Sequence, residues 1–458
     1  MEIESIINGL EGKKVLFIGK TKTMSEEDIE LFLEQAGAQK AENEHDSPIG
    51  MIVFGRLVNP VEEAMCDEME KAGTPVVPIE KLEAYYAATI DAEALIGSLT
   101  LFRNRERIIN LLHNRSVSNS LFCEILKLYD WEGKGPFEGD ENRDVAGSIV
   151  MRFYPDIERN HNIQYSPLGP FLVAAECKEA KLLEAMARIP DYEISQRSTD
   201  FWMPRTLHES LLINPSLPPE VLTLFLDAKE ERKRAFAAMH PMLDAKQQRR
   251  AADSGSELIL TALARNARLD SALHERLLES GYESVVLSFL SHQPLSNAIL
   301  EAVDTFGEKR QEAIGSNPTL DEKSAVKVMA SAKMPLLEAL AMNENLPQGI
   351  YEALFEKGET ALNRKLAANR SVGEAVLLKL VRIRDKEIFT ALAANPSMPQ
   401  PHLKSFSKIK DRQIMAALAS NPSTPIEILL GYQMDAELSN ILKRNEAFGD
   451  YIKQNIGW

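Results

Sequence analysis

The residues best suited to binding chemistry are seven cations in the C-terminal part of the chain. They are Lys357, Arg382, Arg384, Lys386, Lys408, Lys410 and Arg412. Three follow Asn369 by 13, 15 and 17 residues, three follow Asn395 by the same intervals, and one follows Asn343 by 14. Lysine and arginine bind phosphates and carboxylates, so cations that recur at one place in a repeated unit indicate an anionic partner. We call this set the basic ridge.

Three interpretations of the basic ridge stay open. In the first, it binds a nucleic acid or an acidic protein. In the second, it faces the acidic N-terminal part of the same chain. The third interpretation is an ordinary solvated surface between helices, because Glu356, Glu359, Asp385, Glu387 and Asp411 lie among the cations. No aromatic stacking platform accompanies the ridge, which argues against the stacking of unpaired bases.

The cations belong to a repeat that is marked by asparagine. The repeated asparagines are Asn214, Asn266, Asn317, Asn343, Asn369, Asn395 and Asn421, and His240, His292 and Asn445 complete the series, with 24 to 26 residues between neighbours. Leucine or another apolar residue stands three positions before most of them and three, eight and eleven positions after. Proline follows several, and the residue before proline is pushed out of the α region, so each asparagine ends a helix. The pattern predicts two short helices per unit and a core shared by stacked units. The two imidazoles are expected to replace the amide as hydrogen-bond donor.

Two of these units carry a family resemblance. Segments 392–399 (LAANPSMP) and 418–425 (LASNPSTP) resemble the leucine-rich repeat variant family. The resemblance covers residues 206–458 and implies a right-handed α-solenoid of roughly 25–26-residue, two-helix repeats. The best-known form of that family holds an iron–sulfur centre on an N-terminal cysteine cluster. The three cysteines here are far apart, so no cofactor is expected.

Upstream of the regular repeats the pattern fades. Residues 92–205 are predicted to hold degenerate repeats, with an early unit at 108–114. Residues 132–170 are rich in Gly, Pro, Asp and Asn, and we expect an insertion or a long loop there.

Residues 1–91 show a different pattern, in which apolar strands alternate with helices. Strands are expected at 14–19, 51–55 and 75–78, and helices from Ser25 to Gly37, at 61–72 and at 80–88. Ser25 precedes an acidic residue by three positions, which is typical of a helix start. The alternation predicts a small parallel α/β sheet.

This N-terminal module resembles a BRCT domain, particularly that of bacterial DNA ligases. The matching segments are 12–19 (GKKVLFIG), 35–38 (QAGA), 52–55 (IVFG), 71–77 (KAGTPVV) and 80–82 (EKL). The resemblance implies a module that binds proteins or DNA ends. Family members that bind phosphoserine use a hydroxyl residue before the glycine of the first strand and a lysine on the second helix. Ile18 and Cys66 stand at these places, so phosphopeptide binding is not expected.

Motifs of enzyme chemistry are missing from the sequence. It contains no GxGxxG or GxxxxGK phosphate loop, no HExxH and no GxSxG, and its eight histidines do not cluster at metal spacing. Asp200-Phe201-Trp202 places an acid beside aromatic rings, as do the base-stacking sites of helical-repeat DNA glycosylases, although a packed cap is the preferred interpretation. We therefore expect no enzyme activity, no metal and no cofactor.

The charge of the chain narrows the function further. Lys and Arg number 52 and Asp and Glu 68, giving a net charge of −16, and residues 1–91 alone hold 8 basic and 19 acidic residues. This balance excludes a general DNA-coating protein but leaves a local basic surface possible. No apolar run is long enough to span a membrane, and the few cysteines suit the cytoplasm.

The sequence therefore predicts a non-enzymatic binding scaffold with a macromolecular partner, most simply a protein. The first alternative is a repair-associated nucleic-acid-binding protein that uses the basic ridge. The second alternative is a helical-repeat DNA-modifying enzyme.

Overall fold

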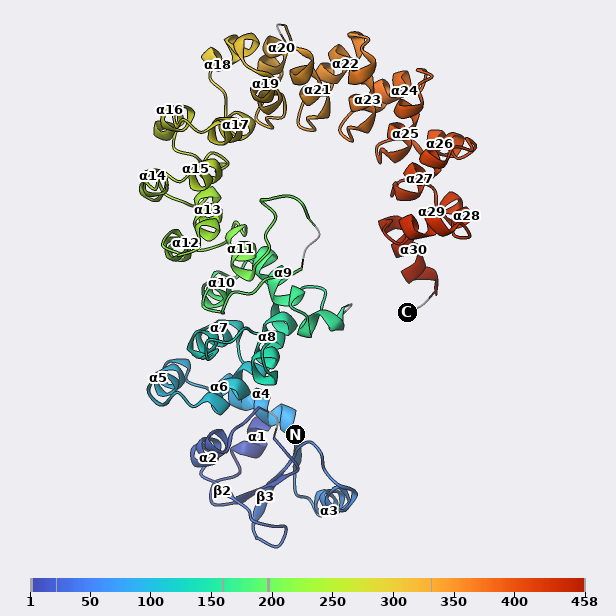
Figure 1. The fold of residues 1–458 in the computed structure, drawn as a ribbon. Helices are drawn as coiled ribbons and strands as arrows, with labels where there is room; N and C mark the ends of the chain where they lie inside the picture. Colours follow the sequence, from blue (N-terminus) through green and yellow to red (C-terminus); the bar gives the residue numbers. More distant parts are fainter. Residues whose placement is uncertain (1–2, 22, 159, 196–197, 331, 457–458) are drawn as a thin grey trace. The chain divides into compact units, whose positions relative to one another are not determined.

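The chain folds into two compact units, which comprise residues 1–242 and 243–458. The computed structural model describes residues 3–21, 23–158, 160–195, 198–330 and 332–456. The fold is mainly helical, and a small sheet lies near the N-terminus (Figure 1). Within the described residues, none of the helices combines the length and apolar character that crossing a bilayer requires.

A four-stranded sheet forms the centre of the N-terminal module. Its strands are β1 (Lys14–Ile18), β2 (Gln39–Lys40), β3 (Ile49–Phe54) and β4 (Val76–Pro78). Their order is β2-β1-β3-β4, and all neighbours are parallel. The three apolar strands and the parallel sheet expected from the sequence are confirmed. The sequence does not predict β2, because both of its residues are exposed at the sheet edge and carry no apolar pattern.

Helices cover both faces of this sheet. The helices are α1 (Ile3–Ile7), α2 (Glu26–Gln35), α3 (Pro60–Lys71) and α4 (Ile79–Thr89). Helices α1, α2 and α4 share one core with the sheet, while α3 packs on the opposite face, where it buries Cys66. Helix α2 starts with the predicted cap: the hydroxyl of Ser25 accepts the backbone N–H of Asp28, and the carboxylate of Asp28 accepts that of Ser25.

The rest of the first unit is helical. Its elements are α5 (Ala92–Phe102), α6 (Arg105–His113), α7 (Asn119–Leu128), α8 (Asp140–Phe153), the 3₁₀ helix η1 (His161–Tyr165), α9 (Leu168–Glu176), α10 (Ala180–Met186), α11 (Leu207–Leu212), α12 (Pro219–Leu226) and α13 (Glu231–Met239). Helices α6, α8, α9, α11 and α13 pack on one another in that order.

Residues 132–170 are not a long loop, so that part of the expectation is wrong, while an insertion within the repeats stays a prediction. They contain the fourteen-residue helix α8, then η1 and the start of α9. Helix α8 buries a continuous stretch from Val145 to Val150. Its apolar face is hidden in the sequence by flanking Gly, Asn and Asp residues, which are frequent in loops.

A buried ion pair joins the N-terminal module to α6. The guanidinium of Arg107 donates to Asp28 at 2.8 Å and to Glu27 at 3.0 Å, and the hydroxyl of Tyr86 donates to Asp28 at 2.8 Å. Arg107 and Asp28 are 4% and 0% exposed. Because a buried charge without its partner is strongly destabilising, this contact ties α2 and α4 to the helical region.

The second unit alternates two sets of helices. Those that end at a repeat corner are α15 (Glu257–Leu263), α17 (Glu283–His292), α19 (Glu308–Gly315), α21 (Met334–Met342), α23 (Thr360–Ala368), α25 (Lys386–Ala394), α27 (Arg412–Ser420) and α29 (Ala436–Leu442). Those that follow a corner are α16 (His274–Leu278) after η2 (Ser271–Leu273), α18 (Asn297–Glu301) before η3 (Val303–Thr305), α20 (Glu322–Ala330), α22 (Gln348–Glu356), α24 (Glu374–Leu380), α26 (Gln400–Phe406), α28 (Ile426–Gly431) and α30 (Glu446–Ile456), and α14 (Ala245–Asp253) precedes them all. From α15 to α29, each helix of the first set packs on the next (Figure 1).

The repeated asparagines are buried at the corners, and their side chains link one corner to the next. For Asn343, Asn369, Asn395 and Asn421, Nδ2 donates to two carbonyls of the preceding corner at 2.8 to 3.2 Å. In each, Oδ1 accepts the backbone N–H two residues further on. Asn317 and, in the first unit, Asn214 make the corresponding bonds, and the Oδ1 of Asn266 accepts the N–H of Arg268. We call these positions the corner column.

One histidine follows the expectation for this column and the other does not. The Nε2 of His240 lies 2.8 Å from the carbonyl of Asn214, and its Nδ1 accepts the N–H of Met242, so the ring replaces both amide functions. His292 instead bonds through Nδ1 to the carbonyl of Ser288 in its own helix. Gln293, one residue later, donates to two carbonyls of the preceding corner. The longer side chain of glutamine reaches the same acceptors from a shifted position.

Replacing a corner asparagine is expected to destabilise the second unit. Asn343→Ala removes two donors and leaves two buried carbonyls unpaired, which costs roughly 2–4 kcal/mol. Asn345→Ala is the matched control, because its side chain is exposed two residues away and makes no bond among the described residues. Urea unfolding followed by circular dichroism measures both. Equal midpoints for the two variants would contradict this role.

The imidazole at position 240 predicts a pH-dependent stability. Burial lowers the pKa of His240 below the ordinary value of ~6.5, so the unfolded chain takes up a proton at a higher pH than the native chain does. The native state therefore loses stability as the pH falls through about 6.5. His240→Asn should be less sensitive than the wild type when urea midpoints at pH 7.5 and pH 5.5 are compared. His161→Asn, at an exposed position, should retain the wild-type sensitivity.

Candidate functional site

The structure exposes all seven residues of the basic ridge. Lys357 lies in the loop between α22 and α23, Arg382 and Arg384 in the loop before α25, and Lys408 and Lys410 in the loop before α27. Lys386 and Arg412 are the first residues of α25 and α27. These positions lie at the helix ends opposite the corner column. The corners of successive repeats are linked by the asparagine side chains, so the loops that carry the basic ridge also follow one another, at the other end of the helices.

Two of the seven cations are held by carboxylates of the next repeat. Lys386 pairs with Asp411 at 2.8 Å, and Arg412 pairs with Asp435 and with Glu437, the latter at 2.9 Å. Hydrogen bonding from Lys386 lowers the pKa of Asp411, and the bonds to Asp435 and Glu437 raise the pKa of Arg412. Asp411 and Asp435 also cap α27 and α29, so these cations stabilise helix starts.

The other five cations have no ion pair within 4.0 Å among the described residues. They are Lys357, Arg382, Arg384, Lys408 and Lys410. Four of the five carboxylates that lie among them are engaged elsewhere: Glu356 by Lys379, Asp385 and Glu387 by Arg364, and Asp411 by Lys386. Of these five carboxylates, only Glu359 lacks an ion pair among the described residues. The ridge therefore presents more free positive charge than its sequence composition suggests.

The aromatic residues of the motif at 200–202 contact other rings, although Phe201 is exposed and Trp202 is partly buried. The ring of Trp202 lies 5.1 Å from that of Phe201 and 6.0 Å from that of Phe236, measured between centroids. The guanidinium of Arg232 lies 4.6 Å from the Phe201 ring and donates to Glu209 at 2.6 Å. The Phe201 ring thus lies over an arginine whose charge is paired, but 46% of Phe201 is exposed, so the packed cap stays a prediction.

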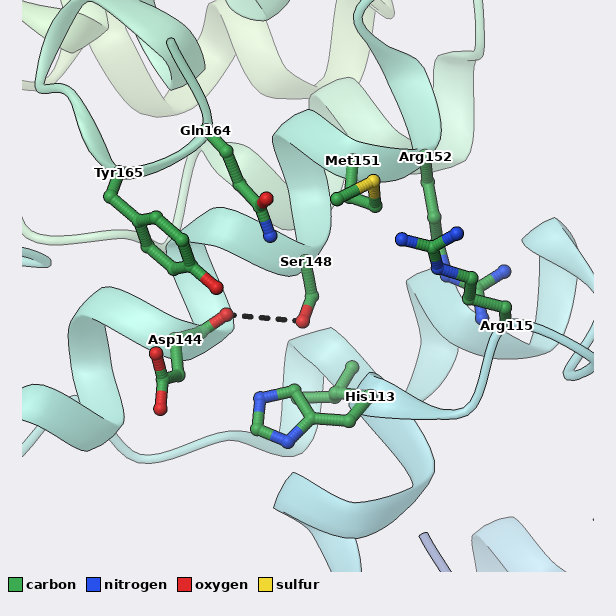
Figure 2. Close-up of a pocket in the computed structure, with 9 residues that line it drawn as sticks. His113, Arg115, Asp144, Ser148, Met151, Arg152, Gln164 and Tyr165 are labelled. Carbon is green, nitrogen blue, oxygen red and sulfur yellow. Dashed lines mark hydrogen bonds between the residues drawn. The ribbon is translucent and has the colours of Figure 1, made fainter. Parts of the chain in front are cut away.

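A pocket in the first unit is not foreseen by the sequence analysis. It has a volume of about 210 Å³ and lies between the end of α6, the middle of α8 and η1. Polar side chains from all three segments line it: His113 and Arg115; Asp144, Ser148 and Arg152; Gln164 and Tyr165 (Figure 2). Gly147 of α8 lets the Tyr165 ring approach, because a Cβ atom there would lie 2.8 Å from the ring.

Arg152 is the unusual group of this pocket. Its Nη1 donates to the carbonyl of Val117 at 2.8 Å and to Asn119 at 3.4 Å, and its Nη2 donates to the carbonyl of Asn114. The guanidinium also lies 4.6 Å from the centre of the Phe122 ring. No carboxylate lies within 4.0 Å of it among the described residues. Burial, with a smaller contribution from the nearby Arg115, lowers the pKa of Arg152 to about 10.

Metal binding and thiol chemistry receive no support from the described residues. They contain no group of three or more His, Cys, Asp or Glu side chains placed to hold a metal ion. The three cysteines are free, and burial raises the pKa of Cys66, of Cys177 and of Cys123, the last to about 12. A raised pKa leaves little thiolate at neutral pH, so none of the three has the character of a nucleophile.

Comparisons with known proteins give no family for the chain. No family model, curated protein or solved structure matches it. The resemblances to leucine-rich repeat variant and BRCT sequences therefore stay predictions, and function has to be inferred from the residues and their geometry.

Proposed function

We propose that the chain is a non-enzymatic binding scaffold that engages an anionic macromolecule through the basic ridge. Residues 206–458 form a right-handed α-solenoid of the leucine-rich repeat variant kind, and residues 1–91 form a BRCT-like module that contacts proteins. The free, reduced cysteines suit the cytoplasm. An array of stacked helical repeats offers a long surface for a partner, which is the usual role of such arrays.

The observation that carries this proposal is the free charge of the ridge. Five exposed cations stand beside one carboxylate without an ion pair, among the described residues of three successive loops. Like charges on one surface repel, and a bound anion removes that repulsion. Exposed arginines also present a planar fork that matches carboxylate and phosphate groups.

We propose an acidic protein as the partner and a nucleic acid as the alternative. The net charge of −16 opposes non-specific binding to nucleic acid, and the loops of the ridge lack aromatic rings for base stacking. The parallel sheet, with helices that alternate with its strands along the chain, supports the BRCT-like proposal for the module, because the resemblance rests on that order of elements. Ile18 and Cys66 are both buried there, so we do not propose phosphopeptide binding.

The test compares two variants that lose the same charge. The ridge variant changes Lys357, Arg382, Arg384, Lys408 and Lys410 to alanine. The control variant changes five exposed cations that lie elsewhere in the second unit and have no ion pair among the described residues: Lys246, Lys309, Lys323, Lys365 and Arg444. Each is used to capture partners from the host extract, with and without nuclease.

The ridge variant is expected to lose partner binding by tenfold or more at low salt, since five contacts of ~0.3–1 kcal/mol are removed. The control variant should keep its partners, and nuclease treatment should leave capture by the wild type intact. Partners that depend on nucleic acid would favour the alternative. Equal retention by both variants would contradict the proposal and leave the ridge as a solvated surface.

A further inference from the structure

We propose that the pocket between α6, α8 and η1 binds a small phosphorylated ligand, whose oxyanion is held by Arg152 and Arg115. The pocket lies within the first unit and is independent of the basic ridge, so neither proposal rests on the other.

The charges that face this pocket are mainly positive. Arg115 follows α6 and Arg152 belongs to α8, and their guanidinium groups lie on the same side of the pocket, while the imidazole of His113 lines another part of it (Figure 2). Asp144 contributes the single carboxylate among the lining residues. Two adjacent guanidinium groups repel each other and are balanced better by a dianion than by a monoanion. A phosphomonoester carries about −1.5 to −2 charges at neutral pH, which fits this requirement.

Arg152 retains donors for such a ligand. A guanidinium has five N–H groups, and the three bonds that Arg152 makes all go to neutral oxygens. Two donors are left, and the charge has no counter-ion among the described residues. A cation that is partly buried without an anion is costly, so a site that holds one is suited to accept an anion from solution.

Part of this arrangement has a structural reason. Asn114 is the corner that follows α6, and Arg152 donates to its carbonyl, as the corner amides of later repeats do to the corner before them. This role accounts for the partly buried position of Arg152. It does not account for Arg115, which is exposed on the pocket rim and makes no hydrogen bond or ion pair among the described residues.

Neutral groups complete the pocket and limit the size of the ligand. Ser148 already donates its proton to the carbonyl of Asp144 at 3.0 Å, so its hydroxyl oxygen is left to accept. The side chains of Gln164 and Tyr165 point toward the same space (Figure 2). A volume of about 210 Å³ is several times the space that one water molecule needs. The pocket therefore fits a phosphate group with a few further atoms, which Ser148, Gln164 and Asp144 can meet with hydrogen bonds.

The test measures binding of inorganic phosphate and methyl phosphate to the full chain by calorimetry, with acetate at equal ionic strength for comparison. The wild type is expected to bind both phosphates and to bind acetate at least tenfold more weakly. Arg115→Ala should weaken phosphate binding tenfold or more while leaving the circular dichroism spectrum unchanged. Arg143→Ala is the matched control, because Arg143 lies exposed on α8, pairs with Asp140 and does not line the pocket.

Three results would overturn the proposal. The first is the absence of phosphate binding to the wild type at millimolar concentration, and the second is equal affinity for acetate and phosphate. The third is equal binding by the wild type and Arg115→Ala. Gln164→Ala provides a second test from another segment of the pocket. It should weaken the binding of methyl phosphate and leave the fold unchanged. Partner capture by the ridge variant tests the scaffold separately, so failure of one proposal is distinguishable from failure of the other.

Discussion

The buried amide at each repeat corner is the interaction on which the helical part of this chain depends. A helix ends with carbonyls that have no partner in the helix, and when such groups are buried each unpaired one costs about 1–3 kcal/mol. In the second unit the Nδ2 of a corner asparagine satisfies two of these carbonyls, and its Oδ1 satisfies an N–H of the following turn. The side chain is short, so the bonds form only when neighbouring corners lie at one fixed distance. The bonds fix the distance between corners in space and not the interval along the chain, which is 26 residues from Asn343 to Asn421 but 24 residues at Asn445, where the same two bonds form.

The exceptions show what the corner column requires. His240 keeps a donor and an acceptor at the amide positions, and Gln293 reaches the same carbonyls from one residue later. Asn114 stands before the regular series: its Oδ1 accepts the N–H of Ser116, but its buried Nδ2 finds no acceptor among the described residues. Arg152 then supplies the donor to the Asn114 carbonyl, with a guanidinium in place of an amide. The corner column therefore requires a hydrogen-bond donor of suitable reach at each corner. Arg152 is the largest side chain that takes this role, and it also lines the pocket between α6, α8 and η1.

Regular spacing is what made most of this fold predictable. The corners, the helices beside them and the three apolar strands follow from local patterns of apolar residues, proline and asparagine. The errors come from features that such patterns do not encode. Helix α8 is flanked by residues typical of loops, and the exchange of His292 for Gln293 depends on side-chain reach. The interval of 25 residues from His292 to Asn317, within a run of 26, was the one sign of that shift. The pocket joins segments of low sequence regularity, so only the folded structure brings Arg115 and Arg152 together.

The distribution of paired charges separates the groups that stabilise the repeats from those that do not. The N-cap aspartates of α25, α27 and α29 each accept a backbone N–H of their own helix and a cation from an earlier repeat. One cation per repeat is used in this way. The remaining lysines and arginines of the loops take part in no cap and no ion pair among the described residues, and their mutual repulsion lowers stability slightly. The stability of the fold gives no reason for their position. Because an anionic partner would turn the same repulsion into attraction, binding supplies a physical reason for cations that folding does not require.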